Sequence, residues 1–213
     1  MINGASGKMG IKVRNLIKND SSLVECFDDI SCSDLVIDFS QPSSTKKIVK
    51  KCVAAKKPII IGTTGFTNDD LNEIREAANS IPIVLAANMS RGIFYLKKSL
   101  ASFIHNNQDK LRCFIEETHH LEKVDRPSGT AIDLKKFIIE HDDNNFIQDV
   151  KIKSNRVANI FGTHKIMFCS DYGTVCFSHE ALSREIFAEG AITCAKSIDF
   201  NKPNLYSFED IIN

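Results

Sequence analysis

Gly4-Ala5-Ser6-Gly7-Lys8-Met9-Gly10 is the stretch that decides the fold, because its glycines follow a Gly-x-x-Gly-x-x-Gly spacing directly before an amphipathic helix. Backbone amides at a helix N-terminus point outward and the helix dipole favours an anion, so this loop could hold a pyrophosphate. Gly7 is the glycine that we expect to approach such a ligand most closely. A turn with a positive φ would also select glycine, but the pattern that follows the loop favours a phosphate cradle. The helix shows one apolar face, formed by Met9, Val13, Leu16 and Ile17.

From this loop to Asn88, short apolar runs alternate with helix-period segments, as parallel strands joined by crossover helices do. Strands are expected at residues 35–39, 59–61 and 83–85, and Thr67 is expected to cap a helix. The sequence therefore predicts an α/β fold with a Rossmann-type doubly wound parallel sheet. Small or polar loops follow the strands at residues 4–10, 40–42, 62–65 and 87–88. Any one of them could be an ordinary loop, but together they outline a ligand site at one sheet edge.

The beginning of this sheet is short. Only Met1, Ile2 and Asn3 precede the glycines, although the first strand of such a sheet belongs at its centre. The second strand is expected at residues 23–26, with almost no chain after it. Glu25 and Asp28 are the candidates for the acidic residue that would hold the ribose of a dinucleotide.

Beyond Asn88 the pattern changes to that of a smaller α+β domain. A helix is expected to begin near Ser90, and strands are expected at residues 111–115, 150–152, 165–168 and 174–177. The last two flank a turn at Asp171-Tyr172-Gly173, which is typical of antiparallel strands. A final helix and a segment capped by Ser207 are expected to return to the first domain. The sequence therefore predicts two domains: residues 1–90 and 185–213 form the first, and residues 91–184 form the second.

The densest chemistry lies in residues 116–131, with the sequence EETHHLEKVDRPSGTA. Two histidines, one lysine and a glycine-flanked helix start suit an anionic substrate that must also gain or lose a proton. Thr130 is expected at the N-cap of that helix, with Asp133 at N3. The alternative to a substrate site is that the two histidines are merely tolerated in a loop and that residues 128–130 form a plain helix cap. No metal is expected, because His119 and His120 should point to opposite faces and no third ligand follows at chelate spacing.

Composition excludes several classes of partner. Lys plus Arg equals Asp plus Glu at 27 each, which argues against a nucleic-acid partner. The seven cysteines are odd in number and lack C-x-x-C spacing, as in a protein with reduced thiols. No apolar run reaches the roughly 20 residues of a membrane span, and no signal-peptide pattern is present. We therefore expect a cytoplasmic protein without a membrane partner.

The run Glu-x-x-His-His-x-x-Lys-x-Asp-x-Pro-Ser-Gly-Thr-Ala at residues 116–131 resembles the signature of the dihydrodipicolinate reductase family, whose members are also named 4-hydroxy-tetrahydrodipicolinate reductases. The resemblance continues at residues 4–10, 36–40, 61–66, 86–90 and 187–191 and covers nearly the whole chain. At residues 202–207, Asn204 replaces the family's usual glycine. The chain also departs in its short first and second strands and in Arg91, where a small or aliphatic residue is usual.

This resemblance implies hydride transfer from NADH or NADPH to 4-hydroxy-tetrahydrodipicolinate or dihydrodipicolinate, giving tetrahydrodipicolinate on the diaminopimelate route to lysine. It implies a homotetramer with a dinucleotide-binding first domain and a second domain for substrate binding and oligomerisation. His119 and Lys123 would be catalytic. Substrate would be bound by His120, Ser128, Gly129 and Thr130. The cofactor would be held by Gly4, Ala5, Ser6, Gly7, Lys8, Met9, Gly62, Thr63, Thr64, Ala86, Ala87, Asn88 and Met89.

Two other functions are compatible with the predicted fold. A non-enzymatic redox sensor would bind the same cofactor but would not need His119, His120 and Lys123 together. An enzyme like a semialdehyde dehydrogenase would need a cysteine nucleophile beside the nicotinamide, and no cysteine is adjacent in sequence to the predicted cofactor loops. Neither alternative explains the motif at residues 116–131.

Overall fold

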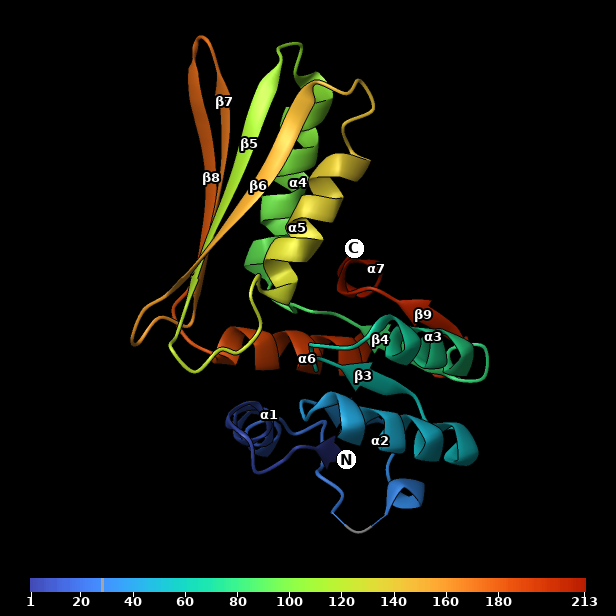
Figure 1. Ribbon diagram of the computed structural model, residues 1–213. Helices are drawn as coiled ribbons and strands as arrows, with labels where there is room; N and C mark the ends of the chain where they lie inside the picture. The colour runs from blue at the N-terminus through green and yellow to red at the C-terminus, as the bar shows by residue number, and fades with distance from the viewer. Residues whose placement is uncertain (28) are drawn as a thin grey trace. The chain divides into compact units, whose positions relative to one another are not determined.

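The computed structural model describes residues 1–27 and 29–213 and divides the chain into two compact units (Figure 1). The first unit comprises Met1–Met89 and Arg184–Asn213, and the second comprises Ser90–Ser183. Both boundaries fall next to the positions at which the sequence pattern changes. Among the described residues, no helix has the length and apolar character needed to cross a membrane.

A five-stranded sheet, parallel throughout, forms the centre of the first unit, in the order β1-β2-β3-β4-β9. Alternate residues of its strands face opposite sides. Ile37, Ile60 and Val84 pack with α1 and α6, whereas neighbouring residues such as Ile59 and Ile83 pack with α2 and α3. The prediction of a doubly wound sheet is therefore confirmed. Its strands are β1 (Ile2–Asn3), β2 (Val36–Asp38), β3 (Ile59–Ile61), β4 (Pro82–Leu85) and β9 (Asn204–Tyr206), and its helices are α1 (Lys8–Lys18), the short 3₁₀ helix η1 (Ile30–Cys32), α2 (Pro42–Ala55), α3 (Asn68–Ala77), α6 (Glu185–Ser197) and α7 (Phe208–Ile212).

The expectation of a second strand at residues 23–26 is wrong. These residues have no regular secondary structure, and β1 pairs only with β2 within the described chain, so it lies at the sheet edge and not at the centre. Two residues of β1 offer few pairing groups to another strand. Val24 is 91% exposed, whereas a strand in the middle of a doubly wound sheet is buried on both faces.

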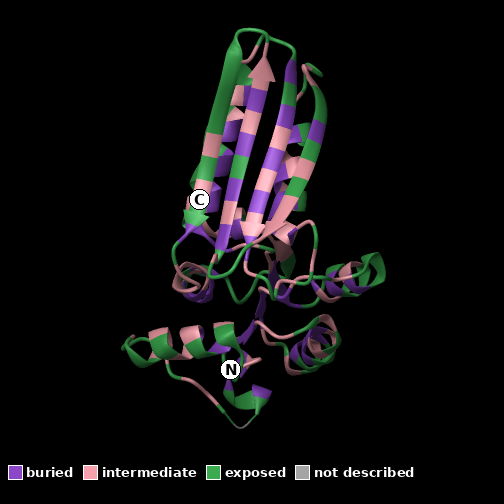
Figure 2. Ribbon diagram, turned by 60° about the vertical axis from the view of Figure 1, so that its left-hand side comes forward, coloured by how far each residue is buried: buried purple, intermediate pink, exposed green. Residues whose placement is uncertain are grey.

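The second unit is a four-stranded mixed sheet in the order β6-β5-β7-β8, with two helices on one face (Figure 1). Its strands are β5 (Leu111–His119), β6 (Ile147–Arg156), β7 (Gly162–Ser170) and β8 (Gly173–Ala181), and its helices are α4 (Arg91–Asn106) and α5 (Gly129–Glu140). Buried residues alternate with less buried ones along the two central strands, β5 and β7 (Figure 2). In β5 this alternation places Ile115, Glu117 and His119 together on the buried side.

Side-chain caps fix where several helices begin. Ser90 caps α4, which begins where the sequence predicted. Thr67 and Ser207 cap α3 and α7, as predicted, and each forms a capping box with an aspartate. The prediction of Thr130 as a cap is wrong. The cap of α5 is Ser128, whose Oγ accepts a hydrogen bond from the Ala131 amide at 3.2 Å. Thr130 lies one residue inside the helix, because the helix already begins at Gly129.

Candidate active site

A different structural reason explains the glycine at each of the three positions in the first loop. Gly4 has a φ of +82°, and a Cβ there would lie 2.6 Å from the Phe39 carbonyl oxygen. A Cβ at Gly10 would lie 2.2 Å from the Gly4 carbonyl oxygen. Gly7, at the N-cap of α1, would bring its Cβ to 3.2 Å from that same oxygen and near no other atom. Packing therefore accounts for Gly4 and Gly10, while Gly7 leaves space beside the start of α1, which fits a pyrophosphate.

Asp38 ties the loops at the carboxyl ends of the strands together. Its buried carboxylate accepts hydrogen bonds from Asn3 Nδ2 at 2.7 Å, Thr45 Oγ1 at 2.6 Å and Thr63 Oγ1 at 2.9 Å. Thr63 Oγ1 also accepts from the Ser40 amide at 3.0 Å. The side chain of Thr63 is thus committed to the sheet, and its backbone is the part left to meet a cofactor.

Two other predicted cofactor residues serve packing. A Cβ at Gly62 would lie 2.1 Å from the Phe39 ring, and the side chain of Met89 is buried in the core of the first unit. Met89 also lies against Gly190, where a Cβ would come within 1.9 Å of the Met89 carbonyl oxygen. The remaining predicted cofactor residues are half-buried or exposed, namely Ala5, Ser6, Lys8, Met9, Thr64, Ala86, Ala87 and Asn88.

Of the two acidic candidates for the ribose, Glu25 lies in the described chain, and its carboxylate is already bound. Arg14 of α1 binds the Glu25 carboxylate with both Nε and Nη2, at 2.8–3.0 Å. Such a bidentate pair occupies the oxygens that would accept ribose hydroxyls. Asp28, the other candidate, lies outside the described residues.

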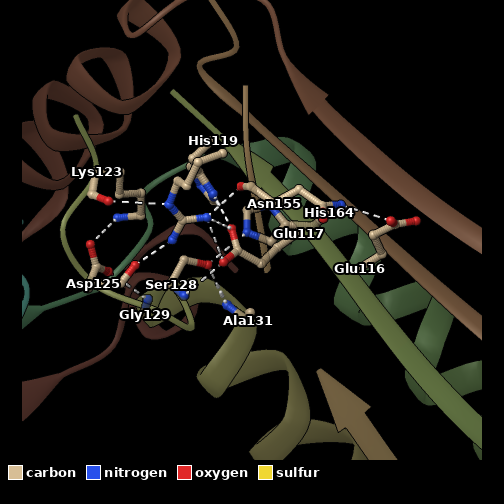
Figure 3. Close-up of polar contacts among 11 residues, drawn as sticks. Glu116, Glu117, His119, Lys123, Asp125, Ser128, Gly129, Ala131, Asn155 and His164 are labelled. Atoms are coloured by element: carbon tan, nitrogen blue, oxygen red, sulfur yellow. Dashed lines mark hydrogen bonds and ion pairs between the residues drawn. The ribbon is translucent and has the colours of Figure 1, made fainter. Parts of the chain in front are cut away.

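In the second unit, His119 ends β5 beside a buried ion pair. Nδ1 of His119 is hydrogen-bonded to Oε2 of Glu117, two residues earlier on the same face of the strand (Figure 3). Arg156, at the end of the neighbouring β6, donates from Nη1 to both Glu117 oxygens, at 3.0 and 3.1 Å. The side chains of Glu117 and Arg156 are 0% and 2% exposed. A buried carboxylate and guanidinium are thus paired next to the predicted catalytic histidine.

Lys123 and the start of α5 meet at Asp125. Lys123 Nζ lies 2.7 Å from Asp125 Oδ1, and the Gly129 amide donates to Asp125 Oδ2 at 3.3 Å (Figure 3). The predicted catalytic lysine and the predicted substrate-binding amide of Gly129 therefore share a carboxylate of the chain itself. Lys123, Gly129 and Ser128 come close to His119 through this loop, because the Ser128 amide also donates to Glu117 Oε1 at 3.3 Å.

His164 of β7 lies behind the predicted catalytic histidine. Its ring meets that of His119 edge to face, with centroids 5.1 Å apart, and its Nε2 lies 3.3 Å from Ser128 Oγ. Nδ1 of His164 is buried without a hydrogen-bond partner among the described residues. His120, a predicted substrate residue, follows β5 and is half-buried.

Burial and charge shift the titration of these groups in opposite directions. Burial lowers the pKa of His119, and the Glu117 carboxylate offsets this only in part. Burial alone would raise the pKa of Glu117, but hydrogen bonds from Ser154, Arg156 and His119 outweigh it and leave the pKa below its usual value. Burial also lowers the pKa of His164 to about 3. Glu117 is therefore ionised and His164 neutral near pH 7.

Sequence reasoning missed Glu117, Asp125, Arg156 and His164 as members of this cluster. Glu117 could have been found, because residues two apart on a strand share a face. Arg156 and His164 are 39 and 47 positions from Glu117 in sequence, and only strand pairing brings them close. Their positions follow from the β5–β6 and β5–β7 register, which pairs His119 with Arg156 and Glu117 with His164.

The first unit offers an open glycine loop at a helix start, and the second offers a titratable histidine, an ammonium group and a helix amide for an anion. Fold and site together define a pyridine-nucleotide-dependent oxidoreductase of two domains.

Comparison with known proteins identifies the family. The family model described as dihydrodipicolinate reductase, N-terminus, matches residues 21–89, and the model described as its C-terminus matches residues 92–212. The chain belongs to the dihydrodipicolinate reductase family, as the motif at residues 116–131 predicted. Members of this family are pyridine-nucleotide-dependent reductases with an NAD(P)-binding domain.

Individual relatives align over nearly the whole chain. The 4-hydroxy-tetrahydrodipicolinate reductase of Alkaliphilus oremlandii is 33% identical and covers 100% of this chain and 98% of its own length. That of Bdellovibrio bacteriovorus is also 33% identical, over 98% and 93% of the two chains. A solved structure, dipicolinate-bound dihydrodipicolinate reductase from Paenisporosarcina sp. TG-14, has a TM-score of 0.73 with 21% identity, covering 99% of this chain and 98% of that chain. That likeness confirms the fold.

Proposed function

We propose that this protein is a 4-hydroxy-tetrahydrodipicolinate reductase. With NADH or NADPH and a proton it reduces dihydrodipicolinate, or 4-hydroxy-tetrahydrodipicolinate with loss of water, and gives tetrahydrodipicolinate, on the diaminopimelate route to lysine. The observation that carries the proposal is the cluster of His119, Lys123 and the Gly129 amide, three groups suited to a carboxylate substrate that needs a proton. Full-length similarity to relatives of that name supports it.

The cofactor is assigned to the first unit. The bound nicotinamide supplies a hydride. Gly7 leaves the amides at the start of α1 accessible to the pyrophosphate, and residues 62–64 and 86–88 flank it at the same edge of the sheet. Thr63 and Met89 contribute through their backbones, because their side chains are held by Asp38 and by the core.

A substrate carboxylate is assigned to Lys123 and to the first amides of α5. These groups already hold Asp125, so a substrate carboxylate would replace Asp125 there or share the ammonium with it. A carboxylate at this position accepts hydrogen bonds from amides that have no partner within the helix, and the ammonium adds a charge-assisted hydrogen bond. Ser128, Thr130 and His120 complete the proposed substrate site.

Reduction of the ring also requires a proton at the carbon next to the one that receives the hydride. His119 is the proposed donor, and Lys123 is the alternative. The His119→Ala variant should therefore lower kcat far more than it raises KM for the dicarboxylate, since it removes an interaction made mainly in the transition state. Steady-state kinetics, followed by reduced-nicotinamide absorbance, measure this. An unchanged kcat would exclude His119 from the chemistry.

The structure weighs against the alternative of a semialdehyde dehydrogenase-like enzyme. Burial raises the pKa of Cys52, Cys113 and Cys194 to about 12, so these thiols are not thiolates near neutral pH. The other cysteines lie outside the loops proposed for the cofactor. A redox sensor would not require the buried Glu117–His119 pair, because it performs no proton transfer. Within residues 1–27 and 29–213, no group of three or more His, Cys, Asp or Glu side chains is arranged to hold a metal ion.

We further infer a cytoplasmic homotetramer. Light scattering coupled to size exclusion should then give about four times the 23.8 kDa of the chain. A mass equal to that of a single chain would contradict the tetramer without affecting the assignment of the activity.

A further inference from the structure

We propose that Glu117, held by Arg156, is a positioning residue that fixes the tautomer of His119 and thereby selects Nε2 as the atom that exchanges the proton. The proposal rests on the proposed function, because it specifies how the histidine of that site works. Glu117 and Arg156 do not carry out the chemistry themselves. They act through the orientation and charge of the His119 imidazole.

The tautomer follows from the chemistry of the contact. An ionised carboxylate only accepts hydrogen bonds, so a bond between Glu117 Oε2 and His119 Nδ1 requires the proton on Nδ1. Arg156 keeps Glu117 ionised, with hydrogen bonds from one guanidinium nitrogen to both carboxylate oxygens. Neutral His119 therefore carries its proton on Nδ1 and presents an unprotonated Nε2.

Space is left at the other ring nitrogen. Gly162, the first residue of β7, lies beside this edge of the ring, and a Cβ there would come within 3.0 Å of His119 Nε2. Among the described residues, Nε2 makes no hydrogen bond. The ring is thus anchored through Nδ1, while Nε2 is available to take up a proton and to pass it on.

Arg156 links this dyad to the substrate loop. Its Nε donates to the Lys123 carbonyl oxygen at 3.2 Å, and its Nη2 donates to the carbonyl oxygen of Asp125. Glu117 itself accepts from the Ser128 amide at the start of α5. One buried ion pair therefore fixes the histidine, the lysine loop and the helix start relative to one another.

The proton inventory is simple. Imidazolium His119 carries protons on both nitrogens, and its Nε2 proton passes to the substrate carbon. The ring returns to the neutral form with the proton on Nδ1, which Glu117 holds throughout. The negative charge of Glu117 favours the imidazolium, against the opposing effects of burial and of the Lys123 and Arg156 charges.

The most direct test is the tautomer of His119 in protein labelled with ¹⁵N-histidine. Long-range ¹H–¹⁵N spectra, recorded at a pH above the pKa of His119, should show that Nδ1 is the protonated nitrogen in the unmodified chain. The signals are assigned by their loss in His119→Gln. In Glu117→Gln, the amide group can donate to Nδ1, and the neutral ring should shift toward the Nε2–H form. An Nε2–H tautomer in the unmodified chain would overturn the proposal, whatever the enzyme activity proves to be.

Kinetics provide the second arm. Glu117→Gln should lower kcat by roughly 100-fold, while KM for the dicarboxylate and Kd for NADH change less than about threefold. Because loss of the carboxylate lowers the pKa of His119, the alkaline limb of the kcat profile should move to lower pH. Glu117→Asp, which keeps the charge, should recover part of kcat. A normal kcat and pH profile for Glu117→Gln would contradict the proposal.

Controls separate positioning from folding. Glu116→Gln changes the neighbouring carboxylate, which lies on the less buried side of β5 and binds Asn155, and should leave kcat unchanged. Glu117→Gln leaves Arg156 buried without its partner and could unfold the chain. The double variant Glu117→Gln with Arg156→Met removes both charges and should regain thermal stability but not turnover. Recovery of kcat in this double variant would show that Glu117 only neutralises Arg156.

Discussion

At the scale of single residues, buried polar groups in this protein do several tasks at once. Asp38 accepts hydrogen bonds from Asn3 of β1, from Thr45 of α2 and from Thr63 after β3, and Glu117 meets a histidine, a guanidinium and the amide at the start of α5. A buried carboxylate that lost such partners would be unfavourable by several kcal/mol, so these groups are fixed in position. The proposed chemistry depends on that rigidity, because proton transfer requires donor and acceptor within hydrogen-bond distance.

Gly7→Val tests the cofactor loop at this scale. We expect a large loss of NADH and NADPH affinity with little change in melting temperature, because the side chain fills the space where pyrophosphate would meet the backbone. Fluorescence titration and thermal melting measure the two effects. Gly4→Ala is the contrasting variant and should destabilise the fold, since Gly4 has a positive φ and touches Phe39. Unchanged affinity in Gly7→Val would refute the assignment.

His164 should make stability depend on pH. Its folded pKa of about 3 is below its unfolded value near 6.5, so between these values the unfolded chain binds more protons and stability falls as pH falls. The effect is up to about 1.4 kcal/mol per pH unit within that window.

Replacing His164 by Gln removes this titration. The drop in melting temperature between pH 7.5 and pH 5 should therefore be smaller in His164→Gln than in the unmodified chain. His105→Gln, at an exposed position of α4, serves as the control and should keep the full pH dependence. Equal pH dependence in the His164 variant and the unmodified chain would show that the buried histidine does not carry the effect.

At the scale of elements, the strand period and the helix caps decide which groups meet. The two-residue period of β5 places Glu117 and His119 on the buried face, and the Ser128 cap directs the first amides of α5 toward the same loop. Both features are local, but the sequence pattern placed the cap two residues late, at Thr130. The pairing of β5 with β6 and β7 is not local, and it alone brings Arg156 and His164 to the site.

Lys123→Met tests the assigned substrate site. KM for the dicarboxylate should rise, or turnover should vanish if Lys123 is also the acid, while Kd for NADH or NADPH stays nearly constant. Gly129→Leu should act in the same way by blocking the amides of α5. A solvated lysine beside an ordinary cap would instead give near-normal kinetics. Steady-state kinetics in both substrates and calorimetric cofactor titration distinguish these outcomes, and a loss confined to cofactor binding would contradict the assignment.

Asp125→Asn should strengthen the binding of a dicarboxylate ligand, in contrast to Lys123→Met. Asp125 occupies the Lys123 ammonium and the Gly129 amide, so removing its charge frees both for the ligand. We expect the Kd for dipicolinate, measured by calorimetry, to fall by about 3- to 10-fold, or roughly 0.7–1.4 kcal/mol. Asp133→Asn, which removes a carboxylate paired with Lys97, is the matched control. Weaker binding in Asp125→Asn would mean that Asp125 orients the loop and does not compete.

At the scale of the whole molecule, the sequence pattern predicted the doubly wound sheet, the second α+β unit and the family. It failed at residues 23–26, where a short apolar run suggested a strand but β1 has only two residues to pair with. The resemblance to the family implied that Thr63 and Met89 hold the cofactor, but it could not show that their side chains are used for a hydrogen bond to Asp38 and for packing. Tertiary contacts of this kind depend on pairs of distant residues, which periodicity does not reveal.

The central claim is that this protein reduces the cyclic dicarboxylate with NADH or NADPH. A coupled assay tests it most directly: the upstream synthase generates the substrate, and the absorbance of NADH or NADPH is followed after this protein is added. We expect oxidation of the cofactor that depends on the synthase product, persists with Glu116→Gln and is lost in His119→Ala while cofactor affinity is retained. No synthase-dependent oxidation by folded, cofactor-binding protein would contradict the account.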